Sequence, residues 1–237
     1  MKKITALIIS HNHEDYLNSL LLDLNKYEKN IIKIIILHNV FPKKKIFIPK
    51  KISKRIFNIY NKKPLGLSKN INKSIKFCKS EFIALINPDI KLYKNVFIDL
   101  LENFRHDKSL ALVSPLIVDK NGKIQDTKRD YPSLINLIKR EIFRVKYKNS
   151  GNDWLAGMFM VFKTRILKRL KFDENFFLYC EDVDIGLRLK KLSYRFLLNK
   201  KISVEHIAQK TSRKNINFLF YHIKSYLYLW KKHGFFK

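Results

Sequence analysis

The feature that most constrains the fold is a regular alternation of continuous apolar runs with segments of helical periodicity over residues 1–118. Apolar runs of this kind are typical of parallel strands that are buried on both faces, and helical segments between them are typical of crossover helices. The alternation therefore predicts an α/β fold with a doubly wound, Rossmann-like sheet. The predicted strands span 4–9, 31–37, 55–61, 81–87 and 110–118, and the predicted helices span 15–24, 67–78 and 94–107.

The second part of the chain is less regular. Basic residues 131–150 are expected to form a helix and a loop, and residues 215–237 form an aromatic, basic tail. Between these segments the expected elements are a strand at 154–163, a helix at 182–192 and two short strands at 194–199 and 201–207. We therefore divide the chain into residues 1–120, residues 121–214 and the tail.

Length and composition favour a folded, basic protein. The chain has 237 residues, of which 46% are hydrophobic, and this is enough for a sizeable core. The formal net charge of +29 attracts anions such as nucleic acid, nucleotides or an acidic membrane face, although AT-rich codons alone would also explain many lysines. Cys78 and Cys180 lack the spacing of metal ligands and are expected to be buried thiols.

Targeting signals are not expected. The first residues briefly look like a signal peptide, but the short apolar run meets polar residues 11–15 without a cleavage site. No apolar stretch reaches the roughly 18 residues that a spanning helix needs, so no transmembrane helix is expected.

Three carboxylates follow an aromatic run in the stretch "FDENFFLYCEDVDIGLRLKK" at 172–191. Glu181, Asp182 and Asp184 would repel nucleic-acid phosphates, and the chain lacks the usual nucleic-acid-binding modules. Asp182 could be a favourable charge in the first turn of a helix, or a general base beside an apolar wall. Both interpretations stay open from the residues alone.

Polar residues follow several predicted strands, at the edge where open parallel sheets bind their ligands. They are Ser10 and Asn12, then His38 and Asn39, then Asn87 and Asp89. The chain lacks both GxGxxG and P-loop motifs, which counts against a dinucleotide-binding or ordinary NTPase function. Gly66 alone makes a weak phosphate loop.

A metal site is a further hypothesis. Asp89 is either a turn residue in an Asn-Pro-Asp sequence or an oxygen ligand for Mg or Mn. His206 is either an ordinary core or surface histidine or the nitrogen ligand of the same ion.

Taken together, six segments match one family in order along nearly the whole chain. They are "ITALIISHN", "KPLGLSKNINKSI", "LINPDI", "WLAGMFMVFK", "FDENFFLYCEDVDIGLRLKK" and "VEHIAQKTS". The chain resembles the family 2 inverting glycosyltransferases, and within them the bacterial rhamnosyltransferase-like members of surface-polysaccharide pathways. The fourth and fifth segments are the most specific.

The resemblance implies a fold of the GT-A type, in which residues 1–120 bind a nucleotide sugar and residues 121–214 bind the acceptor. It implies that Asp182 is the general base, with Glu181 beside it, and that Asp89 and His206 hold Mg or Mn. The implied donor-binding residues are Ser10, Asn12, His38, Asn39, Gly66, Asn70, Asn87 and Asp89. The implied acceptor-side residues are Trp154, Gly157, Asp184 and Arg188, of which the last two are expected to pair along one helix.

The substrates implied are dTDP-rhamnose as donor and a lipid-diphosphate-linked or growing surface glycan as acceptor, in the cytoplasm at the bacterial inner membrane. His38 stands where the family often has an acid near the nucleotide base, so a UDP-hexose is an alternative donor. The residues also leave open a basic nucleic-acid-binding protein and a family member without catalysis. The tail, with its Lys231-Lys232-His233 cluster, is expected either to contact an acidic membrane surface or to pack on the core.

Overall fold

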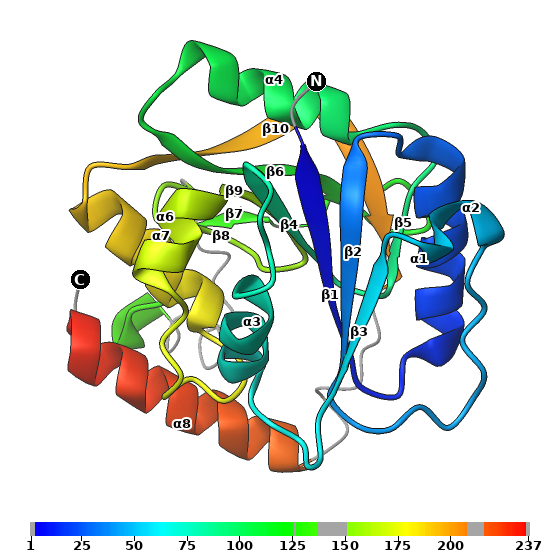
Figure 1. Cartoon of the computed structure of the whole chain (residues 1–237). Coiled ribbons are helices and arrows are strands. Elements are labelled where there is room, and N and C mark those ends of the chain that lie inside the picture. Colours follow the sequence, from blue (N-terminus) through cyan, green and yellow to red (C-terminus); the bar gives the residue numbers. More distant parts are fainter. Residues whose placement is uncertain (1–2, 126, 137–150, 208–215, 236–237) are drawn as a thin grey trace.

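An eight-stranded sheet forms the centre of the molecule in the computed structural model, which describes residues 3–125, 127–136, 151–207 and 216–235 (Figure 1). Its strand order is β3-β2-β1-β4-β9-β6-β10-β5, and β7 and β8 form a separate small sheet. The strands are β1 (Ile4–Ser10), β2 (Ile31–His38), β3 (Ile56–Tyr60), β4 (Phe82–Ile86), β5 (Ile90–Lys91), β6 (Leu110–Val118), β7 (Lys128–Arg129), β8 (Trp154–Leu155), β9 (Phe159–Lys163) and β10 (Arg195–His206).

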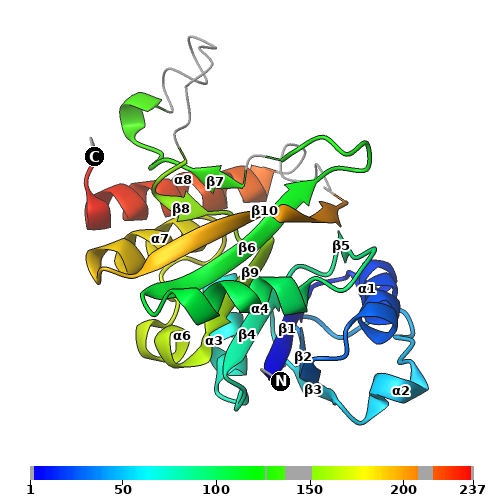
Figure 2. The same cartoon turned by 90° about the horizontal axis from the view of Figure 1, so that it is seen from above.

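Helices cover both faces of the sheet, as Figure 2 shows. One apolar cluster joins the sheet to α1 and α4, through residues such as Leu20 and Phe97. A second cluster joins the opposite face to α3, α6 and α7, through residues such as Ile71, Ile166 and Ile185. The helices are α1 (Glu14–Tyr27), α2 (Lys50–Ser53), α3 (Leu67–Ile75), α4 (Phe97–His106), α6 (Thr164–Leu170), α7 (Glu181–Lys191) and α8 (Ile216–His233). The predicted doubly wound α/β sheet is therefore confirmed.

The four strands β3, β2, β1 and β4 pair in parallel, as their continuous apolar runs indicated. β9 then enters between β4 and β6 and pairs antiparallel with both. The sheet thus takes strands from both 1–120 and 121–214, and each range contributes to one shared core.

The two short strands expected at 194–199 and 201–207 are one strand, β10, and that detail of the prediction is wrong. β10 pairs in parallel with β6, and the register shifts between Asn199 and Ser203. The polar residues at this shift interrupt the apolar pattern without ending the strand, because an extra stretch can bulge out while pairing resumes. Residues 137–150, 208–215 and 236–237, on which parts of the predicted loop, the last motif and the tail fall, lie outside the described residues.

Helix α8 packs its inner side onto α7 and the segment before it. Leu229 and Trp230 are buried there, in a cluster that also contains Val183 and Leu187 of α7. The expectation that the tail packs on the core is therefore correct for one side of the helix.

Asp184 is the charged centre of this contact. It is fully buried and pairs with Arg188 at 2.7 Å, Lys232 at 2.6 Å and His233 at 2.8 Å. The expected pairing of Asp184 with Arg188 is confirmed. Of the Lys231-Lys232-His233 cluster, only Lys231 faces outward, where it could contact a membrane surface. The buried carboxylate of Asp184 draws the side chains of Lys232 and His233 inward.

We predict that Asp184→Asn destabilises the protein by about 3 kcal/mol or more, because it removes the buried counter-charge of Arg188 and one of the two carboxylates that Lys232 contacts. The matched control is Asp15→Asn, which removes an ion pair with Lys44 whose side chains are 71% and 63% exposed. Exposed pairs are worth about 1 kcal/mol or less. Urea unfolding followed by circular dichroism measures both variants, and similar losses in the two would contradict the role given to Asp184.

Candidate functional site

A pocket opens beside the start of α7. Its polar lining comes from Asn87, Glu181 and Asp182, together with the backbone of Gly157. Its other walls are apolar and include Leu67, Ile71, Met160 and Phe172, from α3, β9 and the segment before α7. Two carboxyl groups thus face a small space from which apolar side chains exclude much of the water.

The carboxylate of Asp182 is held by two backbone N–H groups. Gly157 N–H donates to its Oδ2 at 2.9 Å, and Val183 N–H donates to its Oδ1 at 2.9 Å. A Cβ on residue 157 would lie 3.5 Å from this carboxylate, which is an ordinary van der Waals distance. The predicted site residues Gly157, Asp182, Glu181 and Asn87 are therefore brought together.

The chain reaches α7 through two residues in the left-handed region. Tyr179 has a φ of 71° and Cys180 a φ of 63°, which is unusual for residues other than glycine. A neighbouring helix holds this turn in place: the Ser225 hydroxyl of α8 donates to Leu178 O at 2.8 Å. The turn presents Glu181 and Asp182 in the first turn of the helix, where the helix dipole favours negative charge.

Gly66 serves the packing of the same turn. A Cβ at this position would lie 2.8 Å from Phe177 O and 2.9 Å from Phe177 Cα, so a side chain would push the two segments apart. Leu67 N–H also donates to Phe177 O at 2.7 Å. These contacts assign Gly66 a role in joining α3 to the segment before α7, which the sequence pattern alone did not reveal.

The two carboxyl groups of the pocket differ in their surroundings. Burial, followed by the charge of Asp182, raises the pKa of Glu181 to about 8. Burial also raises the pKa of Asp182, but the N–H groups of Gly157 and Val183 and the charge of Arg129 oppose that increase. Glu181 therefore keeps its proton at neutral pH, whereas the two N–H groups and Arg129 favour the ionised form of Asp182.

Asp89 and His206 meet at the end of the sheet. Antiparallel pairing of β5 with β10 sets His206 opposite Ile90, and Asp89 Oδ2 lies 3.3 Å from His206 Nε2. Gln125 orients the imidazole, because its Nε2 donates to His206 O at 3.2 Å and its Oε1 lies 3.1 Å from His206 Nδ1. Nδ1 therefore donates to the Gln125 oxygen, and Nε2 faces a carboxylate oxygen of Asp89.

This donor set fits a divalent cation. Two electron-pair donors 3.3 Å apart repel each other unless a proton or a cation lies between them. Neighbouring ligands of an octahedral ion with bonds of about 2.1 Å are about 3 Å apart, close to the separation seen. Within the described part of the chain, no cluster of three or more His, Cys, Asp or Glu side chains could hold a metal ion, so most ligands would come from substrate phosphates and water.

Asn39 and Asn70 hold the loop between β3 and α3. Asn61 Nδ2 donates to Asn39 Oδ1 at 3.0 Å and to Asn70 Oδ1 at 2.7 Å. Asn39 also exchanges two hydrogen bonds with the backbone of Leu65, at 2.8 and 3.0 Å. These amides are therefore engaged in shaping the loop, and their donor-binding role stays a prediction.

His38 lies at the end of β2, where Ser10 of β1 is its register partner. Its ring is buried, stacks on Tyr60 at 4.6 Å and donates from Nε2 to Asn58 Oδ1 at 3.0 Å. Burial lowers the pKa of His38, so the ring is neutral at pH 7. Tyr60 is half exposed and extends this aromatic surface outward, whereas the exposed Asn12 turns the chain with a φ of 57°.

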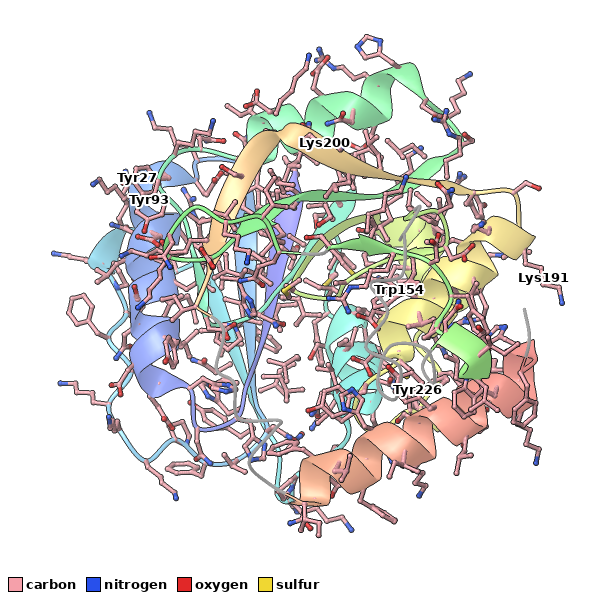
Figure 3. The ribbon with its side chains drawn as sticks, turned by 180° about the vertical axis from the view of Figure 1, so that it is seen from behind. Tyr27, Tyr93, Trp154, Lys191, Lys200 and Tyr226 are labelled. Atoms are coloured by element: carbon pink, nitrogen blue, oxygen red, sulfur yellow. The ribbon has the colours of Figure 1, made fainter. Side chains whose placement is uncertain are left out.

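Three predicted acceptor-side residues lie away from the pocket lining. Trp154 is buried behind α7, and its Nε1 donates to Asp130 O at 2.9 Å (Figure 3). Asp184 and Arg188 form the contact between α7 and α8, and Arg188 also donates to Leu170 O at 2.8 Å. These residues support the site from behind.

Sequence reasoning missed three residues near the site. Gln125 orients His206, and Arg129 lies close enough for its charge to influence Asp182. Burial lowers the pKa of His13, and the charge of Asp89 opposes that shift. His13 therefore lies near Asp89 and His206, which we call the metal-type pair. In the sequence, His13 is marked only by its position after the first predicted strand, and Gln125 and Arg129 only by their position in a polar segment. Neither pattern is specific for a functional residue.

The family model described as "Glycosyl transferase family 2" matches residues 5–171. This segment contains β1 to β9, including Asp89 and Gly157. The chain belongs to glycosyl transferase family 2. The expected resemblance is therefore confirmed, and the protein is a glycosyltransferase.

Curated relatives of this glycosyltransferase include two kinds of rhamnosyltransferase. Rhamnosyltransferase WbbL of Escherichia coli (strain K12) is 26% identical over 251 residues, covering 97% of this chain and 93% of that protein. N-acetylglucosaminyl-diphospho-decaprenol L-rhamnosyltransferase of Mycobacterium tuberculosis is 26% identical over 65% of this chain. The alignment spans only 56% of the mycobacterial protein's length.

Solved structures share the GT-A fold of this glycosyltransferase. A structure of GalNAc-T7 with UDP, GalNAc and Mn²⁺ superposes with a TM-score of 0.68 at 15% identity, covering 87% of this chain and 43% of that one. The mannosyltransferase PcManGT from Pyrobaculum calidifontis, in complex with GDP-Man and Mn²⁺, gives a TM-score of 0.65 at 10% identity, covering 97% and 64%. The GT-A prediction is confirmed by these similarities.

We predict that Glu181→Gln stabilises the glycosyltransferase increasingly as the pH rises. The folded protein keeps the Glu181 proton up to about pH 8, whereas the unfolded chain releases it near the ordinary value of 4.5. The native state binds more protons across this window, so the stability that the group contributes is present at low pH and lost toward pH 8. Glutamine cannot ionise and removes that loss. Thermal unfolding from pH 5 to 9 measures the difference between variant and wild type, and a constant difference would contradict the buried neutral carboxyl.

Proposed function

We propose that this glycosyltransferase transfers rhamnose from dTDP-rhamnose to a hydroxyl group of the acceptor, with inversion at the anomeric carbon. The observation that carries the proposal is the half-buried carboxylate of Asp182, which accepts hydrogen bonds from two backbone N–H groups in a pocket that Asn87 also lines. Asp89, which with His206 forms the metal-type pair, follows Asn87 by two positions. A base and a diphosphate-binding end are therefore adjacent.

The acceptor proposed is a lipid-diphosphate-linked or growing surface glycan. The name of the mycobacterial relative describes transfer of rhamnose to an N-acetylglucosaminyl-diphospho-decaprenol, and WbbL is also named a rhamnosyltransferase. Both names support rhamnose as the transferred sugar, and the name of the mycobacterial protein also supports a lipid-linked acceptor. Such a carrier lies in the membrane, so the proposed location is the cytoplasmic face of the bacterial inner membrane, with the enzyme bound peripherally.

Asp182 takes the proton of the attacking hydroxyl. The acceptor oxygen forms a bond with the anomeric carbon while the bond from that carbon to the diphosphate oxygen breaks, on the opposite face of the sugar. A base on the face opposite the leaving group is the arrangement that gives inversion in glycoside hydrolysis as well. Apolar walls from Leu67, Met160 and Phe172 limit the access of competing water.

Asp89 and His206 would hold Mg or Mn, which when bound neutralises charge on the departing nucleoside diphosphate. Gln125 orients the imidazole for this task by fixing the proton on Nδ1. The proposal needs no further protein ligand, because a hard cation in such sites keeps phosphate oxygens and water in its shell.

Glu181 acts as a neutral hydrogen-bond donor in this scheme. Its Oε2 is buried and has no hydrogen-bond partner within the described residues. A protonated carboxyl can donate to a substrate oxygen, whereas an ionised one would add a second negative charge beside Asp182. Glu181 therefore orients the substrate, and Asp182 accepts the proton.

A UDP-hexose is the second candidate donor. The observation that favours it is His38, which replaces the acid often found near the nucleotide base and is committed to Asn58 and Tyr60. A neutral, buried imidazole gives no strong preference between thymine and uracil. The metal-type pair would bind the diphosphate of either nucleotide.

We predict that the protein binds Mn²⁺ in the presence of nucleoside diphosphate, and that Asp89→Ala and His206→Ala weaken this binding. Gln125→Leu should weaken it about 10- to 100-fold, since outer partners of ligating histidines have effects of that size. His106→Ala is the matched control, because this histidine lies on α4 with its side chain 81% exposed. Calorimetric titration measures all four variants. Undiminished binding in both Asp89→Ala and His206→Ala would exclude the site.

We predict that dTDP-rhamnose is turned over faster than UDP-hexoses, and that Asp182→Asn reduces transfer by about 10²- to 10⁴-fold because it removes the base. Donor binding should survive, since asparagine keeps the size of the side chain. Glu181→Gln should lose much less activity, because it resembles the protonated carboxyl.

Transfer assays with a donor panel, at saturating donor, make both comparisons. Equal or better turnover of UDP-hexoses would overturn the donor assignment. A dead Glu181→Gln beside a near-normal Asp182→Asn would move the base to Glu181.

A further inference from the structure

The outward face of α8 is apolar. Ile216, Phe220, Ile223 and Leu227 follow one another about one turn apart, and their exposed fractions are 80%, 63%, 51% and 54%. A helix on the surface of a water-soluble protein usually carries polar residues on its outer face. A continuous exposed apolar row of this kind marks a surface that contacts another molecule or a membrane.

The helix cannot hide this row by turning. Its inner face already buries Leu229 and Trp230, and Lys232 is tied to Asp184 and Asp173 at 2.6 Å each. α8 is thus apolar on two sides, one packed against α7 and one open to solvent. The long edge of the molecule that α8 forms lies far from α4, which covers the other end (Figure 1).

The charge of α8 is entirely positive. The helix sequence "INFLFYHIKSYLYLWKKH" contains no acidic residue, and Lys224 and Lys231 are exposed beside the apolar row. Among the described residues, no helix is both long enough and apolar enough to cross a membrane. Exposed apolar residues, flanking lysines and aromatic rings together are typical of helices that lie in a membrane interface.

We propose that α8 docks flat on an anionic lipid bilayer, with Ile216, Phe220, Ile223 and Leu227 inserted at the level of the head groups and Lys224 and Lys231 against lipid phosphates. A second copy of the chain fits this face less well. It would bring together two molecules of formal charge +29 and place the lysines of both helices side by side. An anionic bilayer offers the opposite charge over a large area.

Docking in this orientation would bring the pocket close to the lipid surface. The inner side of α8 holds the segment that leads into α7, through stacked rings of Tyr179 and His222 at 3.6 Å and of Phe177 and Tyr221 at 4.8 Å. Lipid binding itself stands on α8 alone. Only this consequence, that the pocket meets a lipid-linked acceptor at the bilayer, rests on the proposed function.

The test is co-sedimentation of the full chain with vesicles, in the absence of donor and acceptor. The protein should bind equimolar phosphatidylcholine and phosphatidylglycerol, bind phosphatidylcholine alone weakly, and lose affinity as salt rises. The double variant Phe220→Asn with Ile223→Asn should reduce binding at least tenfold. Lys224→Gln and Lys231→Gln should each reduce it about fivefold, the value for one lysine near an anionic surface.

The matched control is Leu22→Asn with Ile98→Asn, which changes two exposed apolar residues on α1 and α4 and should bind as the wild type does. Thermal unfolding midpoints verify that each variant is folded. If the α8 double variant does not fold, Lys224→Gln and Lys231→Gln still test the same face of the helix. Wild-type binding by the α8 double variant, or equal losses in the control, would overturn the proposal. So would an α8 variant whose only change is from dimer to monomer in solution. Because no sugar is transferred, failure of the proposed sugar transfer would leave this result standing.

Discussion

Burial of Glu181 and Asp184, with partial burial of Asp182, in the first turn of α7 is the constraint on which the site and its support depend. Each group meets the cost of burial differently. Asp182 is stabilised by two backbone N–H groups, Glu181 keeps its proton, and Asp184 pairs with Arg188 of α7 and Lys232 of α8. A strongly basic chain can gather acids here because its cations are close by. Arg188 and Lys232 compensate the charge of Asp184, and the charge of Arg129 opposes the rise in the pKa of Asp182.

The same turn connects the pocket with the helix that supports it. Asp182 and Glu181 face the pocket, while Asp184, two positions after Asp182, points to α8. Successive side chains on a helix are about 100° apart, so residues two positions apart, such as Asp182 and Asp184, point to nearly opposite sides. Asp182, the proposed base, and the helix that closes the back of the site are therefore positioned by one rigid element, and the left-handed turn at Tyr179 and Cys180 sets where that element begins.

Much of the fold followed from residue patterns. Continuous apolar runs identified β1, β2 and β4, because strands buried on both faces have no polar side to show. The pattern was less informative for β10, where polar residues near a register shift suggested two strands instead of one. It also did not indicate β5, since two residues carry no periodicity; their pairing with β10 is nevertheless what brings Asp89 to His206.

The sequence by itself determined the class of the sheet and the family, since local spacing and order along the chain record them. Only the tertiary structure decided what each residue does in three dimensions. It showed Gly66 as a packing contact with Phe177, Lys232 drawn inward to Asp184, and Gln125 behind His206. These relationships join residues far apart in the chain, and their energies depend on distance and burial, which no local pattern contains.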